Sequence, residues 1–252
     1  MTLRRAIPSL ITLAALTVGL AAIRAALLGD GEEAAWLVLT AMLLDQLDGA
    51  AARLLKARTR IGAELDSFSD FVAFGLAPAF VLIGPPSPEA WPAWLLGERA
   101  LAVVYVCGCA LRLARYNTQD APTGLDVFRG LPSTLAGALA ASAVLTASAH
   151  GGRLRGLALA VLLGVLGVLM VSDPLRPPKI HVLAARLAAR GTLGRAVVIA
   201  NLILVYATVL WRVLPEYVLG LALLYATAGS LMGRRRDASP ALTPSGVAGS
   251  SG

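Results

Sequence analysis

Charged residues are scarce in this sequence, and cysteine and histidine are nearly absent. Only 15% of the 252 residues are Asp, Glu, Lys or Arg, whereas soluble domains carry about 25%. The two Cys lie two positions apart in an apolar run, and the two His are isolated, so neither type has a metal-binding spacing. These shortages argue against a disulfide, a Cys- or His-based metal site, a histidine-dependent triad and an ordinary soluble domain.

Apolar residues dominate instead. They make up 57% of the chain, the mean hydropathy is +0.73, and several apolar runs approach the roughly 20 residues that span a bilayer. The net charge is +7, which by itself could indicate nucleic-acid binding. In a membrane protein, however, excess Arg marks cytoplasmic loops and contacts with anionic headgroups. We therefore expect a lipid bilayer, and no nucleic acid, as the partner.

The apolar runs predict an all-α fold, a polytopic membrane helix bundle of about eight transmembrane helices. With both termini cytoplasmic, 17 of the 22 Lys and Arg lie on the inner side, as the positive-inside rule requires. We read the first run as a retained span rather than a signal peptide. The expected spans cover residues 7–28, 34–55, 62–83, 100–117, 133–149, 154–172, 196–214 and 217–232.

The spans define one membrane domain, residues 1–236, followed by a tail. The tail, residues 237–252, is rich in Ser, Pro, Gly and Ala and is predicted to be disordered. Residues 173–195 have the spacing of an amphipathic helix on the membrane surface, or of a basic loop with one cytosolic helix.

Four aspartates around the turn between the second and third spans are the sharpest signal. Asp45 and Asp48 share one helical face by i, i+3 spacing, and Asp66 and Asp70 share another by i, i+4 spacing. A charged side chain at membrane depth costs roughly 2.5–3.5 kcal/mol. The aspartates could reach the interface or pair with neighbouring basic residues, but four on shared faces indicate hard divalent cations, Mg²⁺ or Mn²⁺.

Two such cations can bridge a diphosphate, and a partly free carboxylate can accept a hydroxyl proton. No nucleophilic Cys and no Ser–His pair is evident, so direct transfer of a phosphoryl-type group to an acceptor is the simplest chemistry. The spacing of the segment is Asp45-x2-Asp48-Gly49-x2-Ala52-Arg53-x8-Gly62-x3-Asp66-x3-Asp70.

This spacing resembles, without departure, the signature of the CDP-alcohol phosphatidyltransferases. The resemblance implies a membrane enzyme that moves a phosphatidyl group from a CDP-linked lipid to an alcohol and releases CMP. It implies that Asp45, Asp48 and Asp66 hold two metal ions, and that Asp70 also contacts metal and is the general base. The positions that match the CDP pocket are Asp48, Gly49, Ala52, Arg53 and Gly62.

Further segments, within a catalytic core of about residues 7–172, resemble the bacterial integral-membrane phosphatidylserine synthases of this family. They read GAELDSFSDFVAFGLAPA, CALRLARYN, FRGLPS and LMVSD. The resemblance implies CDP-diacylglycerol and L-serine as substrates and a homodimer, and the distribution of Lys and Arg predicts a site on the cytoplasmic side of the cell membrane. Arg112 and Arg115 could bind the serine carboxylate in a bidentate pair, with Asn117 beside them. Equally, both Arg could anchor the helix or hold the donor's phosphates, and Asn117 could cap the helix.

Two alternatives remain open at this point. The same transfer could use another acceptor, such as glycerol 3-phosphate, inositol phosphate or choline, or an archaeal-type donor lipid. A divalent cation transporter would also place aspartates within the membrane, but it leaves Gly49, Ala52, Arg53 and Gly62 unexplained.

Overall fold

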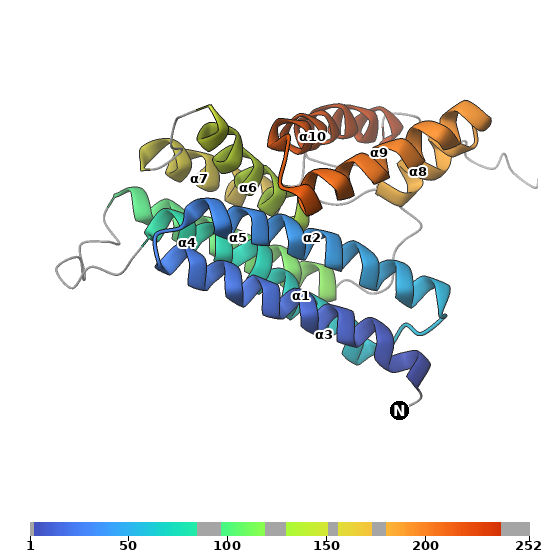
Figure 1. Ribbon diagram of the computed structural model, residues 1–252, viewed down its shortest axis with the longest axis horizontal. Coiled ribbons are helices and arrows are strands. Elements are labelled where there is room, and N and C mark those ends of the chain that lie inside the picture. Colours follow the sequence, from blue (N-terminus) through green and yellow to red (C-terminus); the bar gives the residue numbers. More distant parts are fainter. Residues whose placement is uncertain (1–2, 85–96, 119–129, 151–155, 173–179, 238–252) are drawn as a thin grey trace, which may run out of the picture.

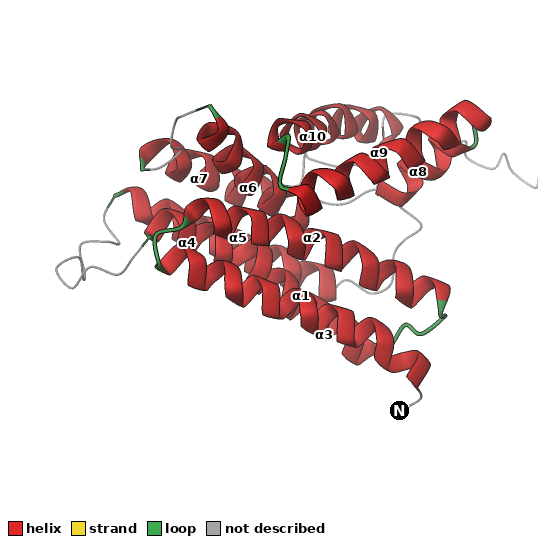
Figure 2. Cartoon of the chain, viewed as in Figure 1, coloured by secondary structure: helices red, strands yellow, loops and turns green. Residues whose placement is uncertain are grey.

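The structure, a computed structural model, describes residues 3–84, 97–118, 130–150, 156–172 and 180–237. Every regular element in these ranges is a helix (Figure 2), which confirms the predicted all-α class. The tail predicted to be disordered lies, from residue 238 on, outside the described residues.

Eleven helical elements follow one another along the described chain. They are α1 (Leu3–Leu27), α2 (Gly31–Leu54), α3 (Arg60–Asp70), the π-helical η1 (Phe71–Leu76), α4 (Ala77–Ile83), α5 (Glu98–Thr118), α6 (Ser133–Ala149), α7 (Leu157–Val171), α8 (Ile180–Ala188), α9 (Thr192–Trp211) and α10 (Pro215–Asp237).

Each predicted span coincides with a helix, and α3, η1 and α4 together form the third. Four segments in the described ranges are long and apolar enough to cross a membrane: Ala6–Leu27, Gly31–Leu54, Arg60–Ile83 and Thr192–Trp211. Helices α6 and α7 are apolar but shorter. The count of eight spans and the cytoplasmic placement of both termini stay predictions.

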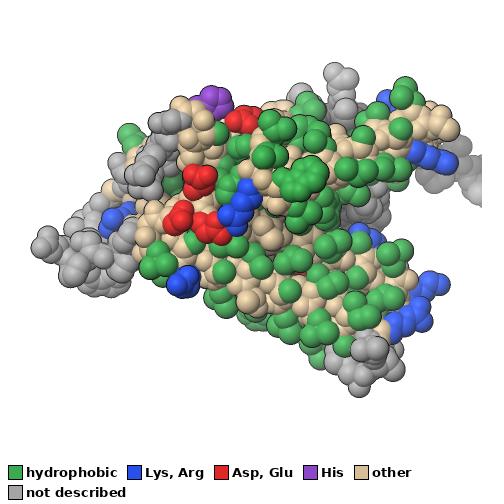
Figure 3. All heavy atoms as spheres, in the orientation of Figure 1, with side chains coloured by type: hydrophobic (Ala, Val, Ile, Leu, Met, Phe, Trp, Pro, Cys, Tyr) green, Lys and Arg blue, Asp and Glu red, His purple; other side chains and the backbone are tan. Residues whose placement is uncertain are grey.

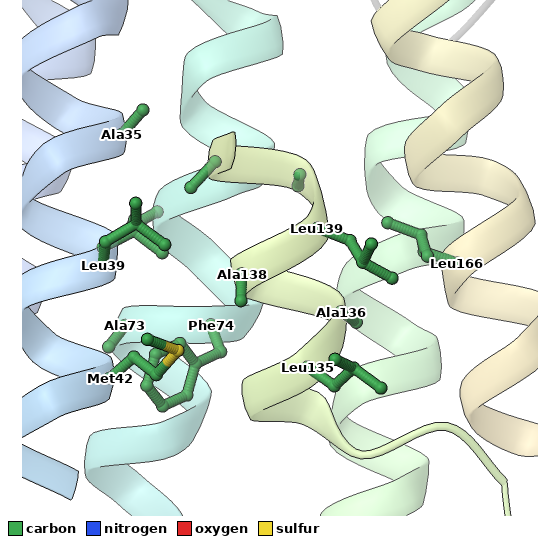
Figure 4. Packing of buried hydrophobic residues seen from close by; sticks show 14 of the residues in the cluster. Ala35, Leu39, Met42, Ala73, Phe74, Leu135, Ala136, Ala138, Leu139 and Leu166 are labelled. Carbon is green, nitrogen blue, oxygen red and sulfur yellow. The ribbon is translucent and has the colours of Figure 1, made fainter. Parts of the chain in front are cut away.

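The helices form two groups that pack along one apolar core. Helices α1 to α5 form the lower group in Figure 1, and α6 to α10 lie above them. Helix α6 packs against α2, η1, α7 and α10, and most of its side chains are buried. Figure 4 shows its Leu135 and Leu139 in the same cluster as Leu39 of α2 and Phe74 of η1. This core joins α2, which carries Asp45 and Asp48, to η1, which directly follows Asp70.

Two side-chain caps begin the helices on either side of the aspartate-bearing turn. The Asp30 carboxylate accepts a hydrogen bond from the Glu33 amide at 2.9 Å and starts α2. The Thr59 hydroxyl accepts one from the Gly62 amide at 3.0 Å and starts α3. Ser, Thr and Asp are favoured at this position because they satisfy amides that have no partner inside the helix. The Thr59 cap therefore fixes the start of α3 ahead of Asp66, whereas Asp30 caps the end of α2 that is far from Asp45.

The third predicted span is not one regular α-helix, because η1 widens it by one turn. The Ala77 amide bonds the Val72 carbonyl, five residues back. Pro78 has no amide hydrogen and so cannot bond the Phe74 carbonyl four residues back. The buried Tyr105 hydroxyl of α5 bonds that carbonyl instead, at 2.5 Å. Such π-turns are frequent at functional sites, and this one directly follows Asp70.

Helices α5 and α7 approach each other closely through glycine. A Cβ on Gly108 would lie 2.4 Å from the Gly167 carbonyl oxygen, and one on Gly167 would lie 2.7 Å from the Tyr105 Cα. Both neighbours are backbone atoms, which cannot rotate away as a side chain can. Small residues at such positions let transmembrane helices pack backbone to backbone.

We predict that Gly167→Ala destabilises the protein, because its methyl group must push α5 and α7 apart. Overpacking a core typically costs about 1–3 kcal/mol, and the measurement is the thermal unfolding midpoint in detergent. Gly220→Ala is the matched control, since Gly220 lies in α10 with nothing within 4 Å of an added Cβ, and its midpoint should stay or rise. An unchanged midpoint for Gly167→Ala contradicts the tight contact.

Candidate metal centre

The structure brings the aspartates of the two predicted faces together. Carboxylate oxygens of Asp45, Asp48 and Asp66 all lie within 4.8 Å of one another. Asp48 is buried, with 6% of its surface exposed, and the other two are partly buried. Helix α1 packs against both α2 and α3, so it holds the two aspartate-bearing helices from one side.

Asp70 lies one helical turn beyond Asp66 and completes the cluster. Its side chain contacts that of Asp45, and its Oδ2 accepts a hydrogen bond from the Ser133 hydroxyl at 3.1 Å. The four aspartates predicted from the sequence as ligands therefore occupy one small volume between α2 and α3.

Mutual repulsion makes this cluster unfavourable without cations. Two carboxylates at such separations repel by roughly 3–4 kcal/mol at an effective dielectric constant of about 20. Arg53 lies near Asp48 and Arg112 lies near Asp70, so two guanidinium groups face four carboxylates. Carboxylate oxygens are the ligands that Mg²⁺ and Mn²⁺ prefer. The donor set therefore fits hard divalent cations.

Thr12 of α1 holds one of these carboxylates, and the sequence analysis did not single it out. Its hydroxyl lies 2.7 Å from Oδ2 of Asp48 and 3.0 Å from the Pro8 carbonyl oxygen. The hydroxyl has one hydrogen, and a carboxylate is a stronger acceptor than a backbone carbonyl, so Thr12 donates to Asp48. The Ser69 hydroxyl of α3 bonds the Thr12 carbonyl at 3.3 Å. The sequence signal that could have identified Thr12 is a polar residue within a first span otherwise rich in Leu and Ala.

The residues matched to a CDP pocket lie beside the aspartates. An added Cβ on Gly49 would lie 3.4 Å from the Arg53 guanidinium, so this side chain folds back over the glycine. Gly62 is packed against its capping threonine, with an added Cβ only 3.0 Å from the Thr59 hydroxyl. Ala52 is partly buried on α2 and Arg53 is exposed. Small residues and one guanidinium thus border the cluster where α2 ends and α3 begins.

Of the three residues predicted to bind the acceptor, Arg112 is the one that the structure places at the aspartates. Its Nη1 donates to the Ser133 hydroxyl oxygen at 2.7 Å, and the same hydroxyl contacts Asp70. Ser133 ends the FRGLPS segment, and its place beside Asp70 depends on how α6 packs, which the sequence alone does not predict.

Arg115 and Asn117 have other contacts. Arg115 donates to the Val171 carbonyl at the end of α7, at 3.1 Å. The Asn117 amide donates to Glu64 at 3.1 Å and to Ser67 at 3.0 Å, both on α3. Both residues thus tie the end of α5 to neighbouring helices.

Comparison with known proteins places this geometry in a family. The family model for CDP-alcohol phosphatidyltransferase matches residues 5–172. The chain is similar to proteins named CDP-diacylglycerol–serine O-phosphatidyltransferase from three bacteria. It is 39% identical to that of Mycobacterium tuberculosis over 133 residues, 36% to that of Bacillus subtilis over 131 and 33% to that of Helicobacter pylori over 171.

The matched regions cover different shares of the proteins. They take up 50%, 52% and 66% of this chain, and 44%, 71% and 69% of the mycobacterial, Bacillus and Helicobacter relatives respectively. The chain thus matches under half the length of the mycobacterial relative. The family model, in contrast, spans the aspartate cluster and α1 to α7. The chain belongs to the CDP-alcohol phosphatidyltransferase family.

Proposed function

We propose that the protein transfers the phosphatidyl group of CDP-diacylglycerol to the hydroxyl of L-serine, giving phosphatidylserine and CMP. The observation that carries this proposal is the cluster of Asp45, Asp48 and Asp66 with carboxylate oxygens within 4.8 Å, set next to Asp70 in a chain of this family. Serine is supported by the names of the relatives.

The reaction exchanges one phosphorus–oxygen bond for another. The serine oxygen attacks the phosphorus that carries diacylglycerol, and the bond from this phosphorus to the CMP phosphate breaks. Asp70 accepts the hydroxyl proton, and CMP leaves with the electron pair of the broken bond. Two divalent cations held by the aspartates, Mg²⁺ or Mn²⁺, supply the positive charge that the diphosphate requires.

The side chains around the aspartate cluster have different roles in this proposal. Gly49 and Arg53, at the end of α2, border the donor's nucleotide diphosphate, because the glycine leaves room and the guanidinium pairs with phosphate. Thr12 holds Asp48 in place. Arg112 is the candidate for the acceptor's carboxylate, since it donates to the Ser133 hydroxyl, which in turn contacts Asp70. Arg115 and Asn117 support the end of α5.

The charge distribution supports a multi-pass protein of the cell membrane whose site faces the cytoplasm. In Figure 3, several Lys and Arg lie at the right-hand end, others lie in the centre and toward the left, and the visible Asp and Glu lie left of centre. The exposed residues around the end of α2 include Arg53, Lys56, Arg58 and Arg60. The positive-inside rule places such an end in the cytoplasm. A homodimer is supported by the family resemblance.

The first test follows CMP release from CDP-diacylglycerol by the purified protein against a panel of alcohols. With Mg²⁺ or Mn²⁺, serine should release CMP, and removal of the metal with EDTA should abolish the release. Glycerol 3-phosphate, inositol phosphate and choline are the comparison acceptors. Failure of serine alongside success of another alcohol would reject the acceptor, whereas failure of every alcohol would reject the transfer.

The second test removes the proposed base. Asp70→Asn keeps the shape of the side chain but cannot take the hydroxyl proton, so kcat should fall by about 10²- to 10⁴-fold while CDP-diacylglycerol binding is kept. Glu64→Gln is the matched control, because Glu64 is an exposed carboxylate on the same helix and should keep activity. Unchanged turnover of Asp70→Asn would overturn the base assignment.

The third test addresses the contact between Thr12 and Asp48. Thr12→Val removes the hydroxyl at nearly constant volume, so Asp48 loses its orientation, and the metal concentration for half-maximal activity should rise by about 10- to 100-fold. Thr17→Val is the control, since its hydroxyl bonds the Leu13 carbonyl of its own helix. Equal metal requirements in both variants would show that Thr12 does not position the ligand.

A further inference from the structure

Ser133 is a fully buried hydroxyl that connects two functional side chains from different helices. It is the first residue of α6, with 0% of its surface exposed. Its hydroxyl oxygen accepts from Nη1 of Arg112 at 2.7 Å and donates to Oδ2 of Asp70 at 3.1 Å. The three side chains come from α5, α6 and α3, so the contact joins three helices at the edge of the aspartate cluster.

The chemistry of the three groups sets the direction of both hydrogen bonds. A guanidinium can only donate, and an ionised carboxylate can only accept. A hydroxyl has one hydrogen and lone pairs, so the Ser133 hydroxyl can satisfy both neighbours only by accepting from Arg112 and donating to Asp70. Both bonds involve a charged partner, which makes them stronger than neutral ones. Rotation of the Asp70 carboxylate would break the second bond.

The backbone before α6 places this hydroxyl. Gly130 has φ of +75°, a conformation that side chains rarely adopt, and its neighbour Leu131 donates its amide to the Leu169 carbonyl of α7 at 3.0 Å. Both residues are buried. Pro132 then leads directly into the helix. The Gly-Leu-Pro turn is thus fixed against the end of α7, and Ser133 follows it at a defined position.

The hydroxyl is not needed to start the helix. The residue at the capping position is Pro132, and no side chain caps this end of α6. Ser142, on the same helix, shows the ordinary behaviour of a buried serine, because its hydroxyl bonds the Ala138 carbonyl of its own helix. Ser133 instead directs its hydroxyl at two charged groups of other helices.

We propose that Ser133 is a positioning residue that fixes the Asp70 carboxylate and couples it to Arg112. This inference rests on the proposed function, in which Asp70 takes the acceptor's proton and Arg112 holds the acceptor. Ser133 keeps the base and the acceptor-binding guanidinium in a constant relation, so that the acceptor's hydroxyl meets Asp70 in the reactive geometry. It does not itself touch the donor.

Kinetics of Ser133→Ala in the detergent-purified full-length chain test this role. Loss of the hydroxyl should lower kcat by about 10- to 100-fold, as for other residues that orient catalytic ligands, while the KM for CDP-diacylglycerol stays near the wild-type value. Ser142→Ala is the matched control, an identical change at a serine that is also 0% exposed on the same helix, and it should keep the wild-type kcat. Thermal midpoints of both variants report folding.

A double-mutant cycle with Arg112→Gln separates positioning from a local packing effect. If Ser133 acts through the Arg112–Asp70 pair, adding Ser133→Ala to Arg112→Gln should lower kcat by no more than about 2-fold further, because coupled residues are not additive. Additive losses overturn the proposal, as does a Ser133→Ala kcat equal to that of Ser142→Ala.

If the wild type accepts another alcohol in place of serine, the same cycle is run with that alcohol. Absence of CMP release by the wild type rejects the proposed function and this inference with it.

Discussion

Repulsion among four carboxylates is the constraint on which this structure depends. The fold places carboxylate oxygens of Asp45, Asp48 and Asp66 within 4.8 Å of one another and adds Asp70 beside them. Such a cluster is stable only when positive charge enters it, and the two nearby guanidinium groups supply half of what four carboxylates need. The cluster is therefore compatible with divalent cations, which would offset the negative charge of a diphosphate-linked donor.

Support for the cluster comes from helices that contribute no aspartate to it. Thr12 reaches Asp48 from α1, and Ser133 of α6 reaches Asp70 while accepting from Arg112 of α5. The π-turn after Asp70 is stabilised in the same way, because the Tyr105 hydroxyl donates to the Phe74 carbonyl, to which Pro78 has no amide hydrogen to donate. Close glycine packing of α5 on α7 holds Tyr105 in position. Contacts from helices that are distant in sequence thus help to determine the geometry of the carboxylates.

Local sequence was enough to predict the helices and the aspartate faces. Apolar runs and polar breaks located the elements, and i, i+3 and i, i+4 spacing correctly grouped Asp45 with Asp48 and Asp66 with Asp70. The π-turn was not predicted, because it depends on Pro78 together with a tyrosine from another helix. Thr12 and Ser133 received no role for the same reason, since periodicity within a helix does not tell which helices meet. Arg112 and Arg115 are close in sequence, yet they contact different helices.

The most direct test of the central claim is the binding of Mn²⁺ to the purified protein, followed by electron paramagnetic resonance as free Mn²⁺ disappears. The carboxylate cluster predicts saturable binding by the wild-type chain in the presence of CDP-diacylglycerol, and its loss when Asp45 and Asp66 are both changed to Asn. The exposed Glu32 and Glu64, changed together to Gln, serve as the charge-matched control and should leave binding intact. Equal Mn²⁺ binding by the Asp45→Asn, Asp66→Asn variant and the wild type would contradict the account.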